Sequence, residues 1–476
     1  MRGAQRHDEP RLIVREIASS LTLLAMTAEG SRRFQSRRKP ATLPAANEGG
    51  ETVARLLFKN CRVWDGSGAP AFPADVLIEG ERIRAVATQR GQLEAAGAET
   101  IESHGMTLMP GLVEGHAHIT FINGARPTDL GDTPPEEHTL IAARNARLLL
   151  DHGFTSAYSA ASAKLRVDVV IRNAIEAGEL PGPRMRACGP EITVTGGLGD
   201  ERRAHQFRDS FAMCADGPVE VTRLARLCVR EGVDSIKLNI SGDDHTRAGA
   251  LPRTVMSEDE IRAGVTVARD FHRMVNAHCR AAESVKRAVR CGVDVIYHCE
   301  HADEEALDLL ESVKDRVFVG PAIGLLHAAV YEAPEGTLHH GVRTGIELGL
   351  AAASRAYPQM KRRGIRVVIG GDYGFARTPQ GENARDIAHF VRHLGYSPGE
   401  ALVCATRHGA ELMGLGDQAG QVREGFLADL LLVDGDPVAD VSLLQHKERL
   451  VAILKAGEVH KLDRATLAQR QMRAAE

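Results

Sequence analysis

The sequence is poor in aromatic residues and lacks several features that would each point to a particular class of protein. Its 476 residues include one Trp and six Tyr. No apolar run approaches the roughly 18 residues that a membrane-spanning helix needs. The 59 basic and 63 acidic residues give a net charge of -4, with both signs spread along the chain. A nucleic acid or a membrane surface is therefore not an expected partner.

Paired cysteines are also missing. The eight cysteines include no Cys-x-x-Cys pair, and a chain of this length does not need a disulfide framework. Reduced thiols in a cytoplasmic protein are the simplest interpretation. Histidine, by contrast, is abundant, with twenty residues, and imidazole is the commonest metal ligand in proteins.

Residues 1–52 differ in composition from the rest of the chain, being rich in Arg, Ala, Ser and Gln. Within them, residues 17–28 are mildly apolar and imitate the core of a secretion signal. Such a signal needs a positively charged N-terminal region, and the acidic residues at positions 8, 9 and 16 argue against one here. We expect a poorly ordered N-terminal extension, and an overlong start of translation is the alternative.

Short strands and turns occupy both ends of the remaining chain. Residues 55–107 alternate strand and turn patterns, with a hairpin expected to turn at Glu79 to Glu81, and residues 428–433 and 450–459 have similar patterns. Each group is too small to hold a core alone. We therefore predict one discontinuous β-sandwich domain, built from residues 53–108 and 420–462, and a C-terminal tail at 463–476.

Between these ends, an amphipathic helix that ends in Gly is followed repeatedly by a short β-branched strand. Thr133-Pro-Pro-Glu136 and Ser257-Glu-Asp-Glu260 are typical capping boxes. Eight such units predict an α/β fold, a closed (β/α)8 TIM barrel over residues 109–419, with a doubly wound open sheet as the alternative. The expected strands are 111–119, 154–158, 184–192, 235–240, 274–278, 294–298, 316–323 and 366–371.

Possible metal ligands follow several of these strands. His116 and His118 are two residues apart, so their side chains share one face of an extended strand. Because the carboxyl ends of barrel strands meet at one mouth, further polar side chains at strand ends are expected to converge there. Two metal ions would need about this inventory of imidazole and oxygen donors. The predicted ligands are His116, His118, Lys237, His278, His298 and Asp372.

Each ligand also has a structural interpretation when it is taken alone. Lys237, between Ile236 and Leu238, could be carboxylated by CO₂ to a carbamate that bridges two cations, or it could pair with a buried Asp. His278 could be a core histidine, and His301 competes with His298 for the same role. Asp372 could cap a helix. These separate interpretations leave unexplained why five strands place a possible ligand at the same end.

Taken in order, these residues resemble the amidohydrolase superfamily. The resemblance rests on Met109-Pro-Gly-Leu-Val-Glu-Gly-His-Ala-His118, the lysine strand, two single-histidine strands, Asp372 and Gly425-Phe-Leu-Ala-Asp-Leu430, and it covers about residues 55–460. It implies a (β/α)8 barrel with a flanking β-sandwich and hydrolysis at a divalent metal centre. The strand-four lysine resembles the imidazolonepropionase-related branch with a bridging carboxylated lysine, which includes dipeptidases and amide or urea hydrolases.

The resemblance also implies a role for each ligand. His116, His118 and Asp372 would hold a more buried ion, His278 and His298 a more exposed one, and carboxylated Lys237 would bridge them. Asp372 would take the proton of a metal-activated bridging hydroxide and pass it to the leaving nitrogen. The two divalent ions are expected to be Zn, with Mn, Co or Fe as alternatives.

The substrate is less well defined by the sequence. Related dipeptidases often carry Gly-Gly-His-Gly where this chain has Gly196-Gly-Leu198-Gly, which puts dipeptide specificity in doubt. Candidate substrate contacts are Tyr373, His327, His301 and Asn239, and the loop at 243–245 is either a further contact or simply solvated. An apolar and aromatic wall around residues 325–331 favours an aryl or alkyl amide, urea or carbamate over a doubly charged dipeptide.

Three functions remain open. The first is a metal-dependent hydrolase that cleaves the C–N bond of an amide, urea, carbamate, N-acyl amino acid or dipeptide. The second is a mononuclear aminohydrolase or cyclic-amide hydrolase in which Lys237 is structural. The third is a noncatalytic scaffold, which would need none of the six ligands. A small-molecule substrate and a homo-oligomeric assembly are expected.

Overall fold

The structure is a computed structural model that describes residues 54–89, 91–93, 96–206, 208–243, 253–338 and 340–475. Val53–Glu476 forms one compact unit. The N-terminal extension expected at 1–52 lies outside the described residues, as do Asp244 and His245 of the loop at 243–245.

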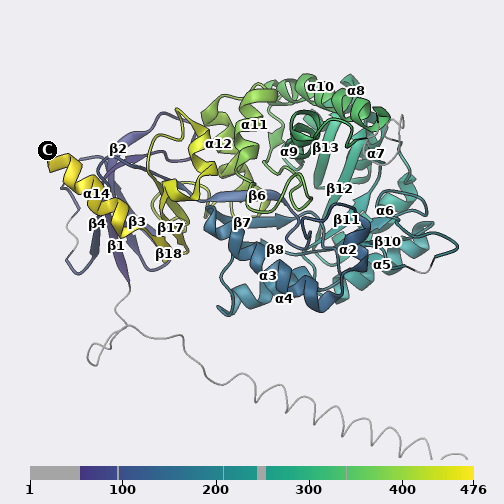
Figure 1. The fold of residues 1–476 in the computed structure, drawn as a ribbon, viewed down its shortest axis with the longest axis horizontal. Helices are drawn as coiled ribbons and strands as arrows, with labels where there is room; N and C mark the ends of the chain where they lie inside the picture. The colour runs from purple at the N-terminus through teal and green to yellow at the C-terminus, as the bar shows by residue number, and fades with distance from the viewer. Residues whose placement is uncertain are drawn as a thin grey trace, which may run out of the picture. The chain divides into compact units, whose positions relative to one another are not determined.

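Strands from both ends of the chain form one eight-stranded sheet in the order β18-β17-β16-β5-β1-β2-β3, with β4 paired to β1 (Figure 1, purple beside yellow). A β-sandwich of two sheets therefore stays a prediction. The strands are β1 (Arg55–Val63), β2 (Phe72–Glu79), β3 (Arg82–Ala87), β4 (Glu99–Glu102), β5 (Thr107–Pro110), β16 (Leu430–Val433), β17 (Leu450–Lys455) and β18 (Glu458–Leu462).

This sheet is held together by a hydrophobic core that draws on both ends of the chain. Phe58 and Ile78 from the N-terminal strands pack in one cluster with Leu430 and Val451 from the C-terminal ones. Burying such side chains stabilises the sheet by about 1.5–3 kcal/mol each. The predicted hairpin between β2 and β3 is confirmed, with their antiparallel pairing running up to Glu79↔Arg82.

The middle of the chain forms parallel strands in two sheets rather than one. The seven-stranded sheet has the order β10-β9-β11-β12-β13-β14-β15, and the three-stranded sheet has the order β6-β7-β8. Their strands are β6 (Leu112–Ala117), β7 (Phe154–Ser159), β8 (Arg184–Arg186), β9 (Cys188–Thr193), β10 (Ala212–Cys214), β11 (Ser235–Asn239), β12 (Met274–Ala281), β13 (Val295–His301), β14 (Phe318–Gly320) and β15 (Arg366–Val367).

The strand expected at 184–192 is interrupted at Ala187, and its two halves belong to different sheets. β8 pairs with β7, whereas β9 pairs with β11. The last expected strand is also shorter than predicted, because β15 ends at Val367; beyond it, Ile369 O accepts a hydrogen bond from Gly115 N at 3.0 Å. The fold is thus mixed α/β with parallel strands, and a closed eight-stranded ring of strand pairs is not detected among the described residues.

Helices follow most of these strands and cover their outer side, as Figure 1 shows for α10 and α8 beside β13. Apolar residues from helices and strands share one large core. The helices are α2 (Thr128–Asp132), α3 (Pro135–Asp151), α4 (Val167–Glu176), α5 (Pro218–Arg230), α6 (Glu258–Asp270), α7 (Ala282–Cys291), α8 (Glu304–Ser312), α9 (Ile323–His327), the π-helix η1 (Ala328–Glu332), α10 (His340–Arg362), α11 (Arg385–His393), α12 (Pro398–Ala405), α13 (Arg407–Leu412), the 3₁₀ helices η2 (Val441–Gln445) and η3 (Lys447–Arg449), and α14 (Arg464–Ala475).

One of the two predicted capping boxes is confirmed. The Ser257 side chain accepts from Glu260 N, and the Glu260 carboxylate accepts from Ser257 N. The box at Thr133 is wrong, because Pro134 is the N-cap of α3 and makes no side-chain bond. The Thr133 hydroxyl instead donates to Asp129 O at 2.8 Å, at the end of α2.

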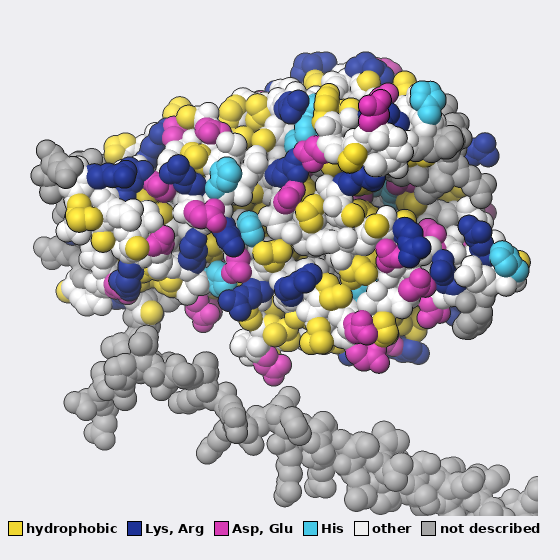
Figure 2. Space-filling view, viewed as in Figure 1, with side chains coloured by type: hydrophobic (Ala, Val, Ile, Leu, Met, Phe, Trp, Pro, Cys, Tyr) yellow, Lys and Arg dark blue, Asp and Glu magenta, His cyan; other side chains and the backbone are white. Residues whose placement is uncertain are grey.

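The cysteines and the surface agree with the composition. All eight cysteines are free thiols, and on the face seen in Figure 2 basic and acidic side chains are interspersed. Among the described helices, none has the length and apolar character required to cross a bilayer.

Candidate metal centre

The six predicted ligands come together in one cavity. His116 lies on β6 and His118 just after it, Lys237 lies on β11, His278 on β12, His298 on β13, and Asp372 follows β15. All six line the same cavity, and each has at most 8 % of its surface exposed.

Asp372 lies against the histidine pair of β6. Its Oδ1 is 3.2 Å from His118 Nε2 and 4.0 Å from His116 Nε2. His116, His298 and Asp372 can each offer one ligand atom, and these atoms lie within 4.8 Å of one another. Nitrogen and oxygen donors at this spacing fit a divalent transition metal such as zinc.

Backbone carbonyls fix the tautomer of two of the imidazoles. His118 Nδ1 lies 3.0 Å from Ala161 O, and His278 Nε2 lies 3.1 Å from Gly242 O. A carbonyl oxygen only accepts, so in each ring the nitrogen beside it carries the proton and the opposite nitrogen keeps a free electron pair. This arrangement orients histidine ligands in many metal sites.

Lys237 is buried without a carboxylate partner. Its side chain is 1 % exposed, and its Nζ lies 4.8 Å from the centre of the Tyr297 ring. Within the described part of the chain, no Asp or Glu oxygen forms an ion pair with it. The interpretation of Lys237 as half of a buried pair with Asp therefore has no support in the geometry.

The electrostatics of the cavity favour ligand forms of these groups. Burial, together with the nearby Arg280 charge, lowers the pKa of His278 to about 3. Burial also holds the pKa values of His116 and His298 well below the ordinary range. For Asp372, burial alone would raise the pKa, but the neighbouring His116 and His118 bring it below its usual value. Neutral imidazoles beside an ionised carboxylate are a metal-binding state.

Strained backbone marks two of the ligands. His298 has a φ of 77° and Asp372 a φ of 61°, a left-handed conformation that residues other than glycine rarely adopt. Such conformations persist where the surrounding structure enforces them, and they cluster at functional sites. Gly370 allows the last turn before Asp372, because a Cβ there would lie 2.3 Å from His116 Cβ.

The chain matches the Amidohydrolase family over residues 107–462. It is a member of the amidohydrolase family. Ochratoxinase from Aspergillus niger is 26 % identical over 455 residues, covering 89 % of this chain and 90 % of the relative. The crystal structure of a Xaa-Pro dipeptidase with methionine bound in its active site superposes with a TM-score of 0.75 at 25 % identity, covering 86 % of this chain and all of that one.

The fold comparison extends to a second crystal structure. That of A. niger ochratoxinase has a TM-score of 0.75 at 21 % identity and covers 87 % of this amidohydrolase and 96 % of the other chain. Family membership and these hydrolase relatives agree with the resemblance found in the sequence and make this chain a hydrolase.

The predicted substrate contacts of this amidohydrolase do not line the cavity. Tyr373 is 2 % exposed, with its hydroxyl toward Gly324. Asn239 is turned into the fold, where its Nδ2 donates to Glu191 Oε2 at 2.6 Å. His301 and His327 are also absent from the lining, whereas Asp243 belongs to it. A residue next to a predicted ligand in the sequence need not contact the substrate, because successive side chains leave a strand on opposite sides. The same alternation keeps Cys279 and Cys299, which directly follow two of the histidines, in the hydrophobic core and out of the cavity lining.

Much of the cavity wall was not singled out from the sequence. Three phenylalanines line it, Phe121, Phe211 and Phe375, and Phe121 stacks on the His118 ring with 4.1 Å between centroids. The exposed Arg377 lines it too, as does Leu198, the wall residue that the sequence had singled out. These residues come from loops, whose side chains leave no periodic pattern in a sequence.

Two buried carboxyl groups beside the predicted ligands, those of Glu114 and Asp386, were also not identified from the sequence. Glu114 Oε1 accepts from His116 N at 3.1 Å, and its Oε2 accepts from Asn383 Nδ2 at 3.0 Å. Asp386 Oδ2 accepts from Gly370 N at 3.0 Å. Burial raises the pKa of Glu114 to about 8 and that of Asp386 to about 7, and the Asp386 charge adds to the shift of Glu114. These groups hold the backbone of the ligand loops.

Proposed function

We propose that this amidohydrolase hydrolyses an amide-like C–N bond of a small molecule at a binuclear metal centre. The observation that carries the proposal is the convergence of four imidazoles, Lys237 and Asp372 on one buried cavity. A binuclear centre needs two sets of donors and a bridging anion, and these side chains can provide both.

The finer architecture belongs to the same proposal. We infer that the two parallel sheets are arcs of one (β/α)8 barrel. At one junction the chain passes from β8 to β9 through Ala187 alone, and at the other Gly115 N donates to Ile369 O. Side chains from both sheets would then face the same mouth, as the shared cavity requires.

The side chains supply binding, orientation and proton transfer. Divalent ions in this centre would lower the pKa of a water molecule and polarise the scissile carbonyl. The Asp372 carboxylate, ionised and on the cavity wall, accepts the proton of the attacking water and delivers it to the leaving nitrogen. The Ala161 and Gly242 carbonyls hold His118 and His278 in the tautomers that bind metal.

Lys237 fits the role of bridging ligand after carboxylation by CO₂. An unpaired ammonium in this position is costly, because it is 1 % exposed and faces the Tyr297 ring. Carboxylation would release two protons from the ammonium and leave an anionic carbamate that could help to hold two divalent ions. A mononuclear centre with a structural Lys237 is the competing arrangement.

The cavity favours an apolar or aromatic substrate. Phe121, Phe211 and Phe375 give it an aromatic wall, and Leu198 replaces a polar group that a dipeptide would meet. Arg377 places a cation at the exposed edge of this wall, where a carboxylate of an N-acyl amino acid could pair with it. A dipeptide also carries such a carboxylate, and one solved structure to which this chain is similar is that of a Xaa-Pro dipeptidase.

Metal analysis combined with a substrate screen tests the proposal. The screen contains N-acyl amino acids, dipeptides, aryl ureas and carbamates, supplied to protein loaded with Zn, Mn, Co or Fe. We expect two more ions per chain than in a variant carrying His116→Ala and His118→Ala, and turnover of an aryl amide. A difference of one ion, with deamination, would instead favour the mononuclear aminohydrolase.

A substitution of Lys237 tests its proposed role as the bridging ligand. Lys237→Ala should lower the metal content and abolish activity, and acetate or formate in the buffer should restore part of both. Lys314→Ala, at a partly exposed surface ion pair, is the matched control. A Lys237→Ala variant with the metal content and the activity of the wild type would contradict the bridging role.

The oligomeric state and the cellular location of this protein are also proposals. We propose a homo-oligomer that acts on a small molecule in the cytoplasm, without a nucleic acid or membrane partner. Light scattering on the purified chain tests the oligomer, and a mass equal to one chain would contradict it.

A further inference from the structure

A second group of histidines lies outside the catalytic cavity. His327 ends α9, and His389 and His393 lie on α11. Residues four apart on a helix project from the same face, so the two α11 imidazoles are side by side. None of the three histidines lines the catalytic cavity.

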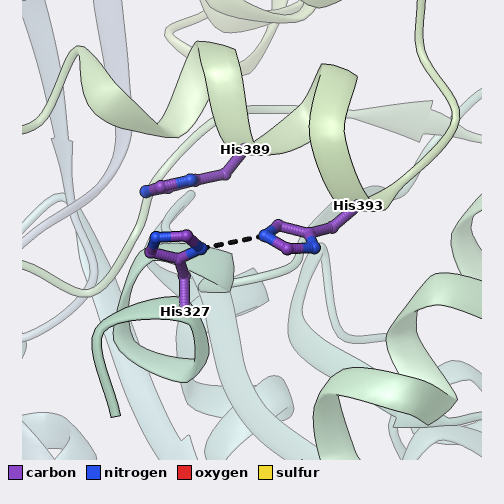
Figure 3. A group of neighbouring side chains, drawn as sticks. All are labelled: His327, His389 and His393. Atoms are coloured by element: carbon purple, nitrogen blue, oxygen red, sulfur yellow. Dashed lines mark hydrogen bonds between the residues drawn. The ribbon is translucent and has the colours of Figure 1, made fainter. Parts of the chain in front are cut away.

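The three rings face one another closely (Figure 3). His327 Nδ1 lies 2.9 Å from His393 Nε2, and the His327 and His389 rings are 4.0 Å apart. One nitrogen from each ring can be chosen so that all three lie within 4.8 Å of one another. The pair of nitrogens at 2.9 Å holds one shared proton, which a metal ion can replace.

A carboxylate prepares His327 as a ligand. Glu332 Oε1 lies 3.4 Å from His327 Nε2 and accepts its proton, which leaves the Nδ1 lone pair free on the side of His393. The same carboxylate pairs with Arg385, and Arg392 lies over the Tyr331 ring. The histidine–carboxylate contact is the arrangement that orients many metal-binding imidazoles.

The burial and the solvent access of the three histidines also suit a metal ion. His327 is 4 % and His389 6 % exposed, so two ligands are held by packing. His393 is partly exposed and gives solvent access. Burial lowers the pKa of His389 to about 2 and that of His393 to about 4, which keeps both imidazoles neutral at physiological pH.

We propose that His327, His389 and His393 form a second metal site, which binds one transition-metal cation such as Zn²⁺ with water as the fourth ligand. Three imidazoles with an open position suit zinc, copper, nickel and cobalt. The ion would join α11 to the segment that gives Leu325 and Ala329 to the wall of the catalytic cavity.

Metal counting in a catalytic-centre background tests the site independently of the proposed function. The full chain carrying His116→Ala and His118→Ala is incubated with Zn²⁺, passed through a desalting column and analysed by mass spectrometry for zinc. We expect this protein to keep one ion that is lost when His393→Gln or His389→Gln is added. His446→Gln, at an exposed histidine, should leave the count unchanged.

The visible absorption of bound Co²⁺ gives a second test of the site. Co²⁺ in the same background should show the visible absorption of a four-coordinate site, and His393→Gln should remove it. If His389→Gln fails to fold by circular dichroism, the partly exposed His393 carries the test. Equal zinc content and an equal cobalt spectrum with and without His393→Gln would overturn the proposal.

Discussion

Asp372 Oδ1 lies 3.2 Å from His118 Nε2, so the last ligand of the predicted centre is in direct contact with one of the first. This contact joins a residue after β15 to the end of β6. A change at Asp372 should therefore affect both metal binding and proton transfer.

Asp372→Asn keeps the shape of the side chain but removes its charge and its ability to accept a proton. We expect kcat/KM to fall by about 10²–10⁴, the range typical of a lost general base, and the metal content to drop. Steady-state kinetics and metal analysis of the same preparation measure both. Asp308→Asn, at an exposed surface ion pair, should behave as the wild type; equal kinetics in the two variants would exclude Asp372 from the chemistry.

Gly370→Ala should disrupt the centre without replacing a predicted ligand. A Cβ at Gly370 would lie 2.3 Å from His116 Cβ and 2.8 Å from Glu114 Oε1, so backbone must move. Overpacking of this kind costs about 1–3 kcal/mol, and we expect a lower urea midpoint and weaker metal binding.

Gly399→Ala is the matched control for that substitution. It lies in the first turn of α12, and a Cβ there would meet nothing within 4 Å. Alanine should leave the protein unchanged or slightly more stable, because it restricts the unfolded chain. Equal destabilisation by both substitutions would contradict the role given to Gly370.

Asp386 should make the metal-free protein less stable as the pH rises. Burial raises its pKa from 3.8 to about 7, so the folded state retains a proton that the unfolded state has released. The associated stability is fully present below pH 3.8 and is lost as the pH rises through about 7. Asp386→Asn imitates the protonated acid, and its urea midpoint should fall less than that of the wild type between pH 6 and about 8. Parallel curves for the two proteins would refute this assignment.

Arg377 should select for substrates with a negative charge. Arg377→Ala removes the exposed cation from the cavity wall, and we expect a KM about tenfold higher for an N-acyl amino acid, equal to the loss of about 1.4 kcal/mol. A neutral aryl amide should show little change. Arg355→Ala, at an exposed position of α10, is the control; an equal rise in KM for both substrates would argue against carboxylate recognition.

The convergence of the six predicted ligands could be predicted from the sequence, because their positions follow from strand geometry. Two residues of spacing put His116 and His118 on one face, and the ends of parallel strands meet. Lys237, His278 and His298 were found by the same reasoning, and all of them line the cavity.

The substrate wall could not be predicted in this way. Phe211 reaches the cavity from the loop between β9 and β10, and Phe375 from the loop between β15 and α11. Their directions depend on tertiary packing. His327 was assigned to substrate because it follows a strand, but it faces His393 instead. The break at Ala187 has no local signal either, because it depends on which neighbour each half of the strand pairs with.

The antiparallel pairing of β5 with β16 joins Met109 to Leu431 across most of the chain. During synthesis, β5 leaves the ribosome long before its partner exists, and all four of its residues are buried in the finished sheet. That edge stays open until the last strands have been made, which exposes it to aggregation. A premature stop codon that removes β16 to β18 would leave this edge permanently unpaired, so we expect such a fragment to be degraded or insoluble even though it retains all six predicted ligands.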